Sequence, residues 1–481
     1  VLQFVFEVFV QCVVSLVMSL ALSEILLPWF NTVMVTELSL LNPYNKWSVA
    51  FLIISILILV SGIFPGLYLS NFNPVKVLKG NFSRSKSGNV LKKTMLVTQF
   101  GISAIFLIAA FIIKMQLSYM NNKNLGFQKD QMLMVRINNS AKTWEKIDTY
   151  KQELKKMKGV EAVGTTNRPP GLYAGNGANS NVDYKELSHQ TDIHFVGADY
   201  FPTMGIKILE GKNFTQDKNI VDPEKTTVDS DGDTLQFNQI MVNKKLVDNF
   251  GFKDPIGKQL DYWGYHGEII GVVDNYIAKG FDEGAYGALY LNYLEDESDW
   301  GKPFHVMVKL NGEDMDGTIA SIEKFWTTAI EPEYPFKYEF LDQNFAQLFA
   351  KHKRLESLVT ILSGIMIFIS LLGLFAIASH SVQQRYKEVA IRKTLGASER
   401  QLVYGLIKDF IIITAISLLI AMPIALFLSN KWLEDFAYRI EMPMVPFILT
   451  PVVMIILTIA IIMAQALKAL KLDLVAHLKY E

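Results

Sequence analysis

The chain has 481 residues, of which 50% are hydrophobic, 12% aromatic and only 19% charged, and its mean hydropathy is +0.23. This balance excludes a disordered, collagen-like or disulfide-rich protein, and it is too apolar for an ordinary cytosolic enzyme. The net charge of −1 gives no support to nucleic-acid binding. The one cysteine, Cys12, lies in an apolar run, which excludes an intrachain disulfide and a cysteine-based metal site.

The apolar residues are concentrated in six runs, each close to or longer than the roughly 20 residues that cross a bilayer as a helix. The runs are Val8 to Leu27, Trp47 to Phe72, Thr94 to Ile113, Ser357 to Gln384, Phe410 to Asn430 and Met442 to Leu467. Buried helices of a soluble protein are the alternative, but about 10 to 14 apolar residues are typical of those. The sequence therefore predicts a polytopic α-helical membrane protein with six transmembrane helices.

Lysine and arginine residues in the short loops set the expected orientation. Three basic loops, which follow the second, fourth and sixth spans, can all face the cytoplasm at once. Their basic residues are Lys76, Lys79, Arg84, Lys86, Lys92 and Lys93; Arg385, Lys387, Arg392, Lys393 and Arg400; and Lys468, Lys471 and Lys479. The long segment 118–354 is then extracytoplasmic. It carries 27 basic and 35 acidic residues, against 19 and 12 elsewhere, so the near-neutral total is a cancellation between two parts.

The start of the chain and an internal repeat suggest a longer protein. Val1 comes without an initiator Met or a basic segment before the first span. The octapeptide Asn73 to Gly80, after the second span, matches Asp473 to Tyr480 after the sixth. We therefore interpret the chain as the C-terminal part of a two-copy protein, with the complete second copy beginning at about Val90.

The segment 118–354 alternates strand-like and helix-like patterns, which predicts an α+β domain in two lobes. The predicted strands are Met132 to Ile137, Val160 to Thr166, Ile193 to Gly197, Gln239 to Asn243, Glu268 to Val273, Ala288 to Tyr293, Val306 to Leu310 and Phe336 to Leu341. Predicted helices carry Trp144, Ile147, Leu154 and Met157, and span Lys244 to Phe250 and Met315 to Thr328.

The junction between this domain and the fourth span predicts a stiff helical stalk. Asp342 is a candidate helix cap, and apolar residues then recur at spacings of three and four, straight into the span. They include the stalk residues Phe345, Leu348, Phe349 and Leu355. One helix is expected from Phe345 to Ala378, with Leu117, Met120 and Asn124 continuing the third span as its partner. A flexible linker is the alternative, but this segment lacks the Gly, Ser or Pro that one needs.

Motifs for catalysis or for a bound cofactor are not found. No P-loop occurs; its nearest approach, Gly251 to Lys258, has the wrong glycine spacing. The acidic turn Asp229 to Asp233 lacks the glycine and glutamate of a calcium loop, and the histidines have no third zinc ligand in a known spacing. The sequence thus predicts a protein that is not an enzyme and that holds no metal or cofactor. Glu7, Glu24, Lys408 and Asp409 are expected to anchor spans at the interface, with an ion relay as the alternative.

The loop between the fourth and fifth spans predicts a short amphipathic cytoplasmic helix. Its residues are Arg385, Tyr386, Lys387, Glu388, Val389, Ile391, Arg392, Lys393, Leu395, Gly396 and Ala397, with Gly396 as a C-cap. Such a helix either lies on anionic lipid or docks in a groove of a soluble partner.

The segment Arg385 to Ser398 closely resembles the "R-x-x-E-I-x-I-R-K-x-L-G-A" motif of permeases of the MacB/FtsX type of ABC transporter. Three further stretches resemble the large two-copy permeases of this group. They are Asn73 to Gly80, Trp432 to Ile440, and Val196 to Phe201 with Met204 to Ile206 and Glu210 to Gly211. The resemblance covers essentially the whole chain.

This resemblance implies a domain order. Residues 1–80 would be the last two transmembrane helices of a first permease copy. Residues 81–117 would form the cytoplasmic basic loop and first transmembrane or stalk helix of the second copy. Residues 118–354 would be a MacB-like periplasmic core domain, and 355–481 an FtsX-like three-helix permease domain. The segment from Arg385 would be the coupling helix seated on a separate ATPase.

The resemblance also implies a function and partners. The chain would be a permease subunit in the bacterial inner membrane that couples ATP hydrolysis to movement of its extracytoplasmic domain, a mechanism called mechanotransmission. It would serve export or extraction of a peptide, antibiotic or lipid-linked substrate. The implied partners are two copies of an ABC ATPase, which would hold the ATP and Mg²⁺, a second permease copy in the same longer chain or in a homodimer, and a periplasmic adaptor. The alternative is a membrane-anchored sensor whose external domain binds a ligand or partner without transport.

Overall fold

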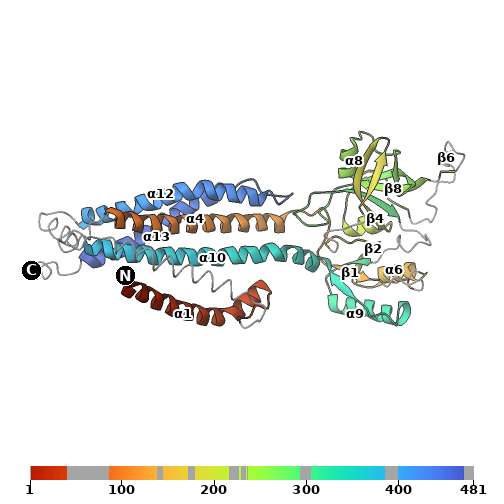
Figure 1. Ribbon diagram of the computed structural model, residues 1–481. Helices are drawn as coiled ribbons and strands as arrows, with labels where there is room; N and C mark the ends of the chain where they lie inside the picture. Colours follow the sequence, from red (N-terminus) through yellow and green to blue (C-terminus); the bar gives the residue numbers. More distant parts are fainter. Residues whose placement is uncertain are drawn as a thin grey trace, which may run out of the picture. The chain divides into compact units, whose positions relative to one another are not determined.

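The computed structural model describes residues 2–40, 86–137, 143, 145–171, 179–215, 227–228, 234–235, 237–292, 305–384 and 399–470. The chain divides into two compact units (Figure 1). The helical unit comprises Val1–Met115, Lys353–Asn430 and Met442–Glu481. The α/β unit comprises Gln116–His352 and Lys431–Glu441.

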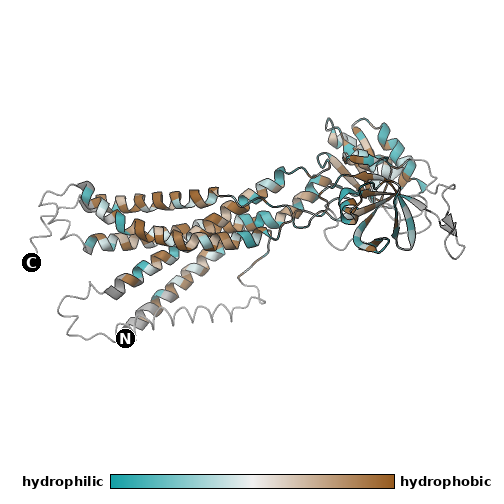
Figure 2. Cartoon of the chain, turned by 90° about the horizontal axis from the view of Figure 1, so that it is seen from above, coloured by the Kyte–Doolittle hydropathy of each residue, from teal (hydrophilic) through white to brown (hydrophobic). Residues whose placement is uncertain are grey.

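Five described helices are long and apolar enough to cross a membrane, and Figure 2 shows how hydrophobic residues dominate them. They are α1 (Leu2–Met34), α4 (Lys86–Asn122), α10 (Leu341–Gln384), α12 (Glu399–Leu433) and α13 (Val445–Leu470). These helices contain the first, third, fourth and fifth predicted spans and all but the first three residues of the sixth. The second predicted span, Trp47 to Phe72, lies outside the described residues. The predicted fold class, a polytopic helical membrane protein with an α+β domain, is confirmed.

The helical unit is held together by small side chains between α4 and α10. Ser370 Oγ donates to the carbonyl of Gln99, 3.1 Å away, and lies 2.8 Å from Ser103 Oγ. Ser363 Oγ donates to the carbonyl of Phe106 at 2.9 Å. Helices in lipid associate through such close contacts because lipid chains are as apolar as leucine. An apolar core shared with α12 and α13 surrounds this contact, with Leu96, Phe100, Leu374, Ala378, Phe410, Ile413, Met454 and Ile462 buried.

The first lobe of the α/β unit is a split βαβ fold. Its elements are β1 (Met132–Arg136), α6 (Ile147–Lys156), β2 (Val160–Thr166), β12 (His305–Leu310), α9 (Met315–Phe325), the π-helical turn η2 (Trp326–Ile330) and β13 (Tyr338–Phe340). The strand order is β2-β12-β1-β13, with every neighbouring pair antiparallel, as in ferredoxin-like folds. The helices cover this sheet through the buried rings of Tyr150 and Trp326, whose centroids are 5.4 Å apart.

The second lobe is inserted between β2 and β12 and forms a closed ring of strands. It contains β3 (Asn179–Tyr184), β4 (Leu187–Val196), α7 (Tyr200–Met204), β5 (Ile208–Gly211), β8 (Phe237–Asn243), α8 (Lys244–Phe250), β9 (Gln259–Tyr262), β10 (Tyr265–Val273) and β11 (Gly287–Asn292). The ring β11-β8-β10-β9-β3-β4 closes because β11 also pairs with β4 in parallel. The short strands β6 (Thr227–Val228) and β7 (Thr234–Leu235) pair separately.

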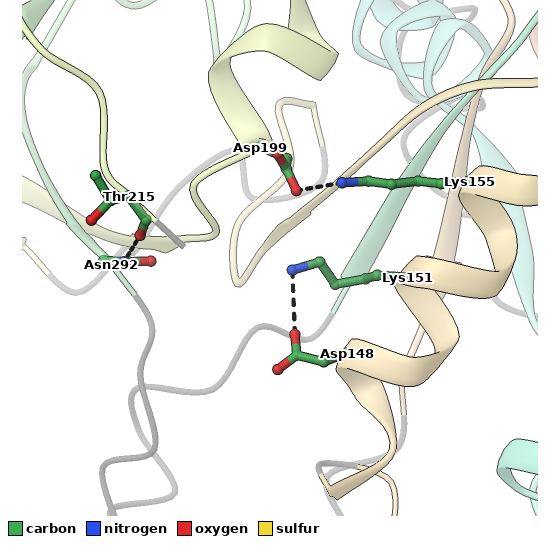
Figure 3. Close-up of polar contacts among 6 residues, drawn as sticks. All are labelled: Asp148, Lys151, Lys155, Asp199, Thr215 and Asn292. Atoms are coloured by element: carbon green, nitrogen blue, oxygen red, sulfur yellow. Dashed lines mark hydrogen bonds and ion pairs between the residues drawn. The ribbon is translucent and has the colours of Figure 1, made fainter. Parts of the chain in front are cut away.

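Polar contacts tie the elements of the two lobes (Figure 3). Between the lobes, Lys155 Nζ on α6 lies 2.7 Å from Asp199 Oδ2 at the start of α7. Within the second lobe, Asn292 Nδ2 donates to the carbonyl of Thr215 at 3.3 Å. The Lys155 side chain is 40% exposed, so this ion pair contributes at most about 1 kcal/mol. The backbone joins the lobes more firmly, because β2 pairs with β4 at Thr166 and Val196.

Most of the predicted strands are present, with boundaries shifted by a few residues. The β2 strand and the α8 helix match their predicted bounds, and the start of β4 is earlier, at Leu187. Two details of the prediction are wrong: Leu341 begins α10 instead of ending a strand, and Met157 caps α6 instead of lying within it. Trp144 lies outside the described residues.

Candidate functional site

The residues predicted to carry function fall into two groups. The coupling segment, from Arg385 to Ser398, lies outside the described residues. The stalk residues Phe345, Leu348, Phe349 and Leu355 all lie in α10, a single helix of 44 residues that begins in the α/β unit and ends in the helical unit. The first three belong to the α/β unit, where three further segments meet the start of α10. We call these four segments the junction: 116–127, 276–286, 341–352 and 431–441.

Aromatic rings hold the start of α10 in the junction. Phe345 is fully buried, and its ring centroid lies 5.3 Å from that of Phe127, just beyond the end of α4. Phe349, one turn further along α10, lies 5.4 Å from Phe281. The close packing requires glycine at position 171, where φ is +84° and a Cβ would lie 2.9 Å from the Phe345 ring. The rings thus fix one end of the stalk helix to the domain.

The predicted cap of this helix is wrong in one respect. The helix begins at Leu341, one residue before Asp342, so Asp342 lies in the first turn and is not the residue that precedes the helix. Its carboxylate accepts a hydrogen bond from the backbone N–H of Gln343 at 2.8 Å. An acidic side chain in the first turn still stabilises the helix through the backbone N–H groups that have no partner within it.

The end of α4 is held by one buried amide, that of Gln116. Its Nε2 donates to the carbonyl of Tyr438 at 2.9 Å, and its Oε1 accepts from the N–H of Ile440 at 3.0 Å. Gln116 is fully buried, so both backbone groups depend on it in place of water. Leu117 and Met120, predicted to continue this helix, are buried in α4, whereas Asn124 lies beyond its end at Asn122.

The loop 276–286 joins the segment 431–441 to the domain. The carbonyl of Phe281 accepts hydrogen bonds from the N–H groups of Ala437 and Tyr438, at 3.1 and 3.3 Å. The Phe281 ring, which is buried, packs edge-on against that of Tyr438 with centroids 6.0 Å apart. On the other side of this loop, Ile277 donates its N–H to the carbonyl of Leu125 at 2.8 Å. One loop therefore contacts the continuations of α4, α10 and α12.

A contact between a histidine and a carboxylate completes the junction. His352 Nε2 lies 3.1 Å from Asp282 Oδ1, and the His352 ring lies 5.1 Å from that of Phe436. Phe436 in turn packs against Trp432, with centroids 4.9 Å apart. Asp282 is half exposed, so this pair contributes little stability compared with the buried rings. Its main effect is to fix the direction of α10 relative to the loop 276–286.

Within the α/β unit, the junction brings the start of α10 together with the continuations of α4 and α12. Each of the three helices that leave the α/β unit, α4, α10 and α12, or its direct continuation, is bonded to the same loop or the same short segment. Among the residues that the structure describes, no cluster of three or more His, Cys, Asp or Glu side chains could hold a metal ion. Sequence reasoning identified the α10 residues but missed Gln116, Phe281 and Tyr438. The one local signal was Gln116 itself, a glutamine three residues after the apolar third span.

Comparison with protein families gives two adjoining matches. Residues 94–325 match the MacB-like periplasmic core domain, and residues 360–474 match the FtsX-like permease C-terminal domain. The first match contains most of α4, both lobes as far as α9 and the loop 276–286. The second contains most of α10, the segment predicted to be a coupling helix, and the helices α12 and α13.

Similar proteins include two curated relatives. The uncharacterized ABC transporter permease YknZ of Bacillus subtilis is 23% identical over 278 residues, which are 56% of this chain and 64% of YknZ. The macrolide export ATP-binding/permease protein MacB of Aggregatibacter actinomycetemcomitans is 23% identical over 235 residues, 47% of this chain and 33% of MacB. The matched region thus covers less than two thirds of either relative.

Solved structures of extracytoplasmic regions are also similar. The extracellular domain of the ABC-type transporter YknZ from Gram-positive bacteria matches with 16% identity and a TM-score of 0.29, covering 43% of this chain and 98% of that domain. The periplasmic region of MacB from Actinobacillus actinomycetemcomitans matches with 15% identity and a TM-score of 0.30, covering 47% of this chain and 96% of that region.

Proposed function

The chain belongs to the MacB/FtsX type of ABC transporter permeases, and we propose that it couples ATP hydrolysis by a separate ATPase to movement of its α/β unit. The protein is a multi-pass membrane protein. In the proposed mechanism the segment 385–398 contacts the ATPase, and α10 carries the movement to the junction. The chain itself binds no nucleotide in this mechanism and transfers no group.

One observation carries this proposal: α10 is continuous from the junction to Gln384, the residue before the proposed coupling segment. At 1.5 Å per residue its 44 residues span roughly 66 Å. No glycine or proline occurs in its first 23 residues, before Gly364, so the part nearest the junction has no built-in hinge. In this proposal the part of α10 before Gly364 moves as one body.

The junction explains how the movement of one helix would reach the whole domain. Phe345 and Phe349 attach α10 to Phe127 and Phe281, and Phe281 is bonded to the segment 437–438. Since Gln116 bonds the same segment, a displacement of α10 also acts on the end of α4. Within the α/β unit, the start of α10 is therefore held by packed rings and hydrogen bonds, which supports the proposed stalk.

Further parts of the proposal come from the family. The ATPase would act as two copies, with a second permease copy in the same longer chain or in a homodimer, and a periplasmic adaptor would contact the α/β unit. The location would be the bacterial inner membrane, with residues 118–354 extracytoplasmic. The substrate would be a peptide, an antibiotic or a lipid-linked molecule that is exported or extracted.

The proposal is tested at the coupling segment. Leu395→Asp and Arg392→Asp should abolish co-purification with the cognate ATPase and remove the stimulation of its ATPase activity. Arg400→Asp serves as a control, because Arg400 lies in the same basic stretch but in α12, after the motif. Unchanged association in both motif variants would refute the coupling role.

A hydrolysis-deficient ATPase separates transport from sensing. Mechanotransmission requires that movement of the α/β unit stops when the ATPase binds but does not hydrolyse ATP. A sensor would still change conformation when it binds its ligand. Ligand-dependent change that persists at full amplitude with the deficient ATPase would therefore favour the sensor.

A further inference from the structure

A small cleft opens in the second lobe of the α/β unit, beside the loop 276–286. Its cavity has a volume of about 30 Å³, enough for one or two water-sized groups. Its walls combine acidic and aromatic side chains from β4, β11, this loop and the segment 431–441. The lining residues used below are Asp192, His194, Lys279, Glu283, Tyr286 and Tyr438.

An ammonium group of the chain itself already occupies this site. Lys279 Nζ lies 2.6 Å from Asp192 Oδ2 and 4.2 Å from the centroid of the Tyr286 ring. The Lys279 side chain is 13% exposed and that of Asp192 5%. A carboxylate beside the face of an aromatic ring is a combination that attracts cations, since the ring presents negative charge on its face. Lys279 shows which chemical group the cleft accepts.

Lys279 leaves one carboxylate oxygen of the cleft without a hydrogen bond from the described residues. Asp192 Oδ1 is buried and has no hydrogen-bond donor among the described residues. A buried carboxylate oxygen without a donor is unusual, because the loss of water is not compensated. Glu283 adds a second carboxylate, and burial followed by the nearby Glu283 carboxylate raises the pKa of Tyr286. Two carboxylates thus face one resident ammonium.

Histidine does not offset this negative charge. Burial lowers the pKa of His194 to about 4, although Asp192 next to it acts in the opposite direction. At neutral pH its imidazole is therefore uncharged. Counted by formal charge, the residues that line the cleft, among them Asp192, Glu283 and Lys279, sum to −1.

We propose that this cleft binds an external primary ammonium group, which displaces the Lys279 ammonium from Asp192 and uses the free Oδ1 as a further acceptor. The three N–H groups of a primary ammonium can bond to both oxygens of Asp192 while its charge faces Tyr286. A quaternary ammonium can face the ring but offers no N–H donor to the carboxylate.

The position of the cleft links such a ligand to the junction. Lys279 lies two residues before Phe281 and three before Asp282, which contact the segment 437–438 and His352. Release of Lys279 from Asp192 would therefore remove one of the contacts that hold the loop 276–286. This link rests on the proposed function, whereas the ammonium site does not and can be measured without nucleotide or ATPase.

Chemical rescue tests the site in the full chain in detergent micelles. The Lys279→Ala variant removes three carbons and the ammonium beyond Cβ, a loss that propylammonium matches. Propylammonium should raise the thermal midpoint of Lys279→Ala with a half-saturating concentration at least tenfold lower than in the wild type. Tetramethylammonium at equal ionic strength should have no such effect. Equal responses to the two cations, or to propylammonium in Lys279→Ala and the wild type, would overturn the proposal.

Two further variants test ammonium binding at the cleft without relying on the folding of Lys279→Ala. Glu283→Gln, at a partly exposed position, should weaken binding of propylammonium to the wild-type background several-fold without a change in the unliganded midpoint. Lys337→Ala is the matched control, because the Lys337 ammonium lies over the Tyr334 ring, 5.8 Å from its centroid, away from the cleft. A rescue of equal size in Lys337→Ala, or unchanged binding in Glu283→Gln, would contradict the site.

Two binding experiments distinguish a peptide amine from a lipid headgroup as the source of the ammonium group. If it is a peptide amine, triglycine amide should bind and its N-acetylated form should not. If it is a lipid headgroup, nanodiscs of phosphatidylethanolamine should protect the loop 276–286 from hydrogen exchange and those of phosphatidylcholine should not. A response in either arm identifies the source, and the absence of a response in both would overturn the binding of an external ammonium.

Discussion

Replacement of Gln116 by leucine should release the segment 431–441 from the end of α4. The wild-type amide satisfies two backbone groups, the carbonyl of Tyr438 and the N–H of Ile440, at 2.9 and 3.0 Å. Leucine has a similar size but bonds to neither. Because Gln116 is fully buried, each group would be left without a partner, at a cost of about 1 to 2 kcal/mol. The local opening free energy should therefore fall by about 2 to 4 kcal/mol.

Hydrogen exchange measures this release at a defined atom. At about 1.4 kcal/mol per tenfold change, the amide of Ile440 should exchange roughly 30-fold faster or more in Gln116→Leu. Gln152→Leu is the control, since Gln152 is exposed on α6 and its replacement should change stability by less than about 0.5 kcal/mol. The reasoning is refuted if exchange at Ile440 rises by less than about threefold while the protein remains folded.

Three other predictions concern the α/β unit. Gly126→Ala should destabilise it by about 3 kcal/mol or more in urea unfolding, because φ is +85° and a Cβ would lie 2.8 Å from the Asn275 carbonyl oxygen. Gly251→Ala, at φ +68° with no atom within 4 Å of the Cβ, should cost only about 1 to 2 kcal/mol; equal costs would contradict the packing argument. Phe281→Ala, which removes a buried ring, should cost about 3 to 5 kcal/mol and loosen residues 437–438 in hydrogen exchange, whereas unchanged exchange there would argue against the loop as a link. Burial lowers the pKa values of both His194 and His305 to about 4, so stability should be lost as pH falls below about 6.5, where the unfolded histidines bind protons that the folded ones do not. From pH 7 to 5 each should cost about 2 kcal/mol, and a flat urea midpoint over that range would contradict their neutral burial.

Sequence patterns predicted the elements whose signals are local. The bounds of α8 match because Asn243 accepts from the N–H of Leu246 at its start, and Gly251, at φ +68°, ends it. The strands β3 and β9 were missed because they contain many polar residues and few large apolar ones. Their extended conformation depends on pairing with each other, which the sequence of either strand does not indicate. The start of α10 at Leu341 was also missed, since a strand pattern runs directly into the helix there.

In the stalk and the junction, too, local patterns were predicted from the sequence and contacts between distant residues were not. The three- and four-residue spacing from Phe345 onward predicted a helix as far as Ala378, and the apolar run Ser357 to Gln384 predicted the residue at which α10 ends. The contacts of Phe281 with Tyr438 join residues 157 positions apart, and no pattern in either segment indicates its partner. The prediction that the segment from Arg385 is a coupling helix rests on its motif, and it stays a prediction.

The central claim is that ATP hydrolysis by a partner moves α10 and so changes the junction. Hydrogen exchange of residues 276–286 and 431–441, measured in the permease–ATPase complex with ATP and without nucleotide, tests it most directly. The account predicts a change in protection in both segments that disappears with a hydrolysis-deficient ATPase and is reduced in Gln116→Leu. Equal protection with and without ATP, in a complex that hydrolyses ATP, would contradict it.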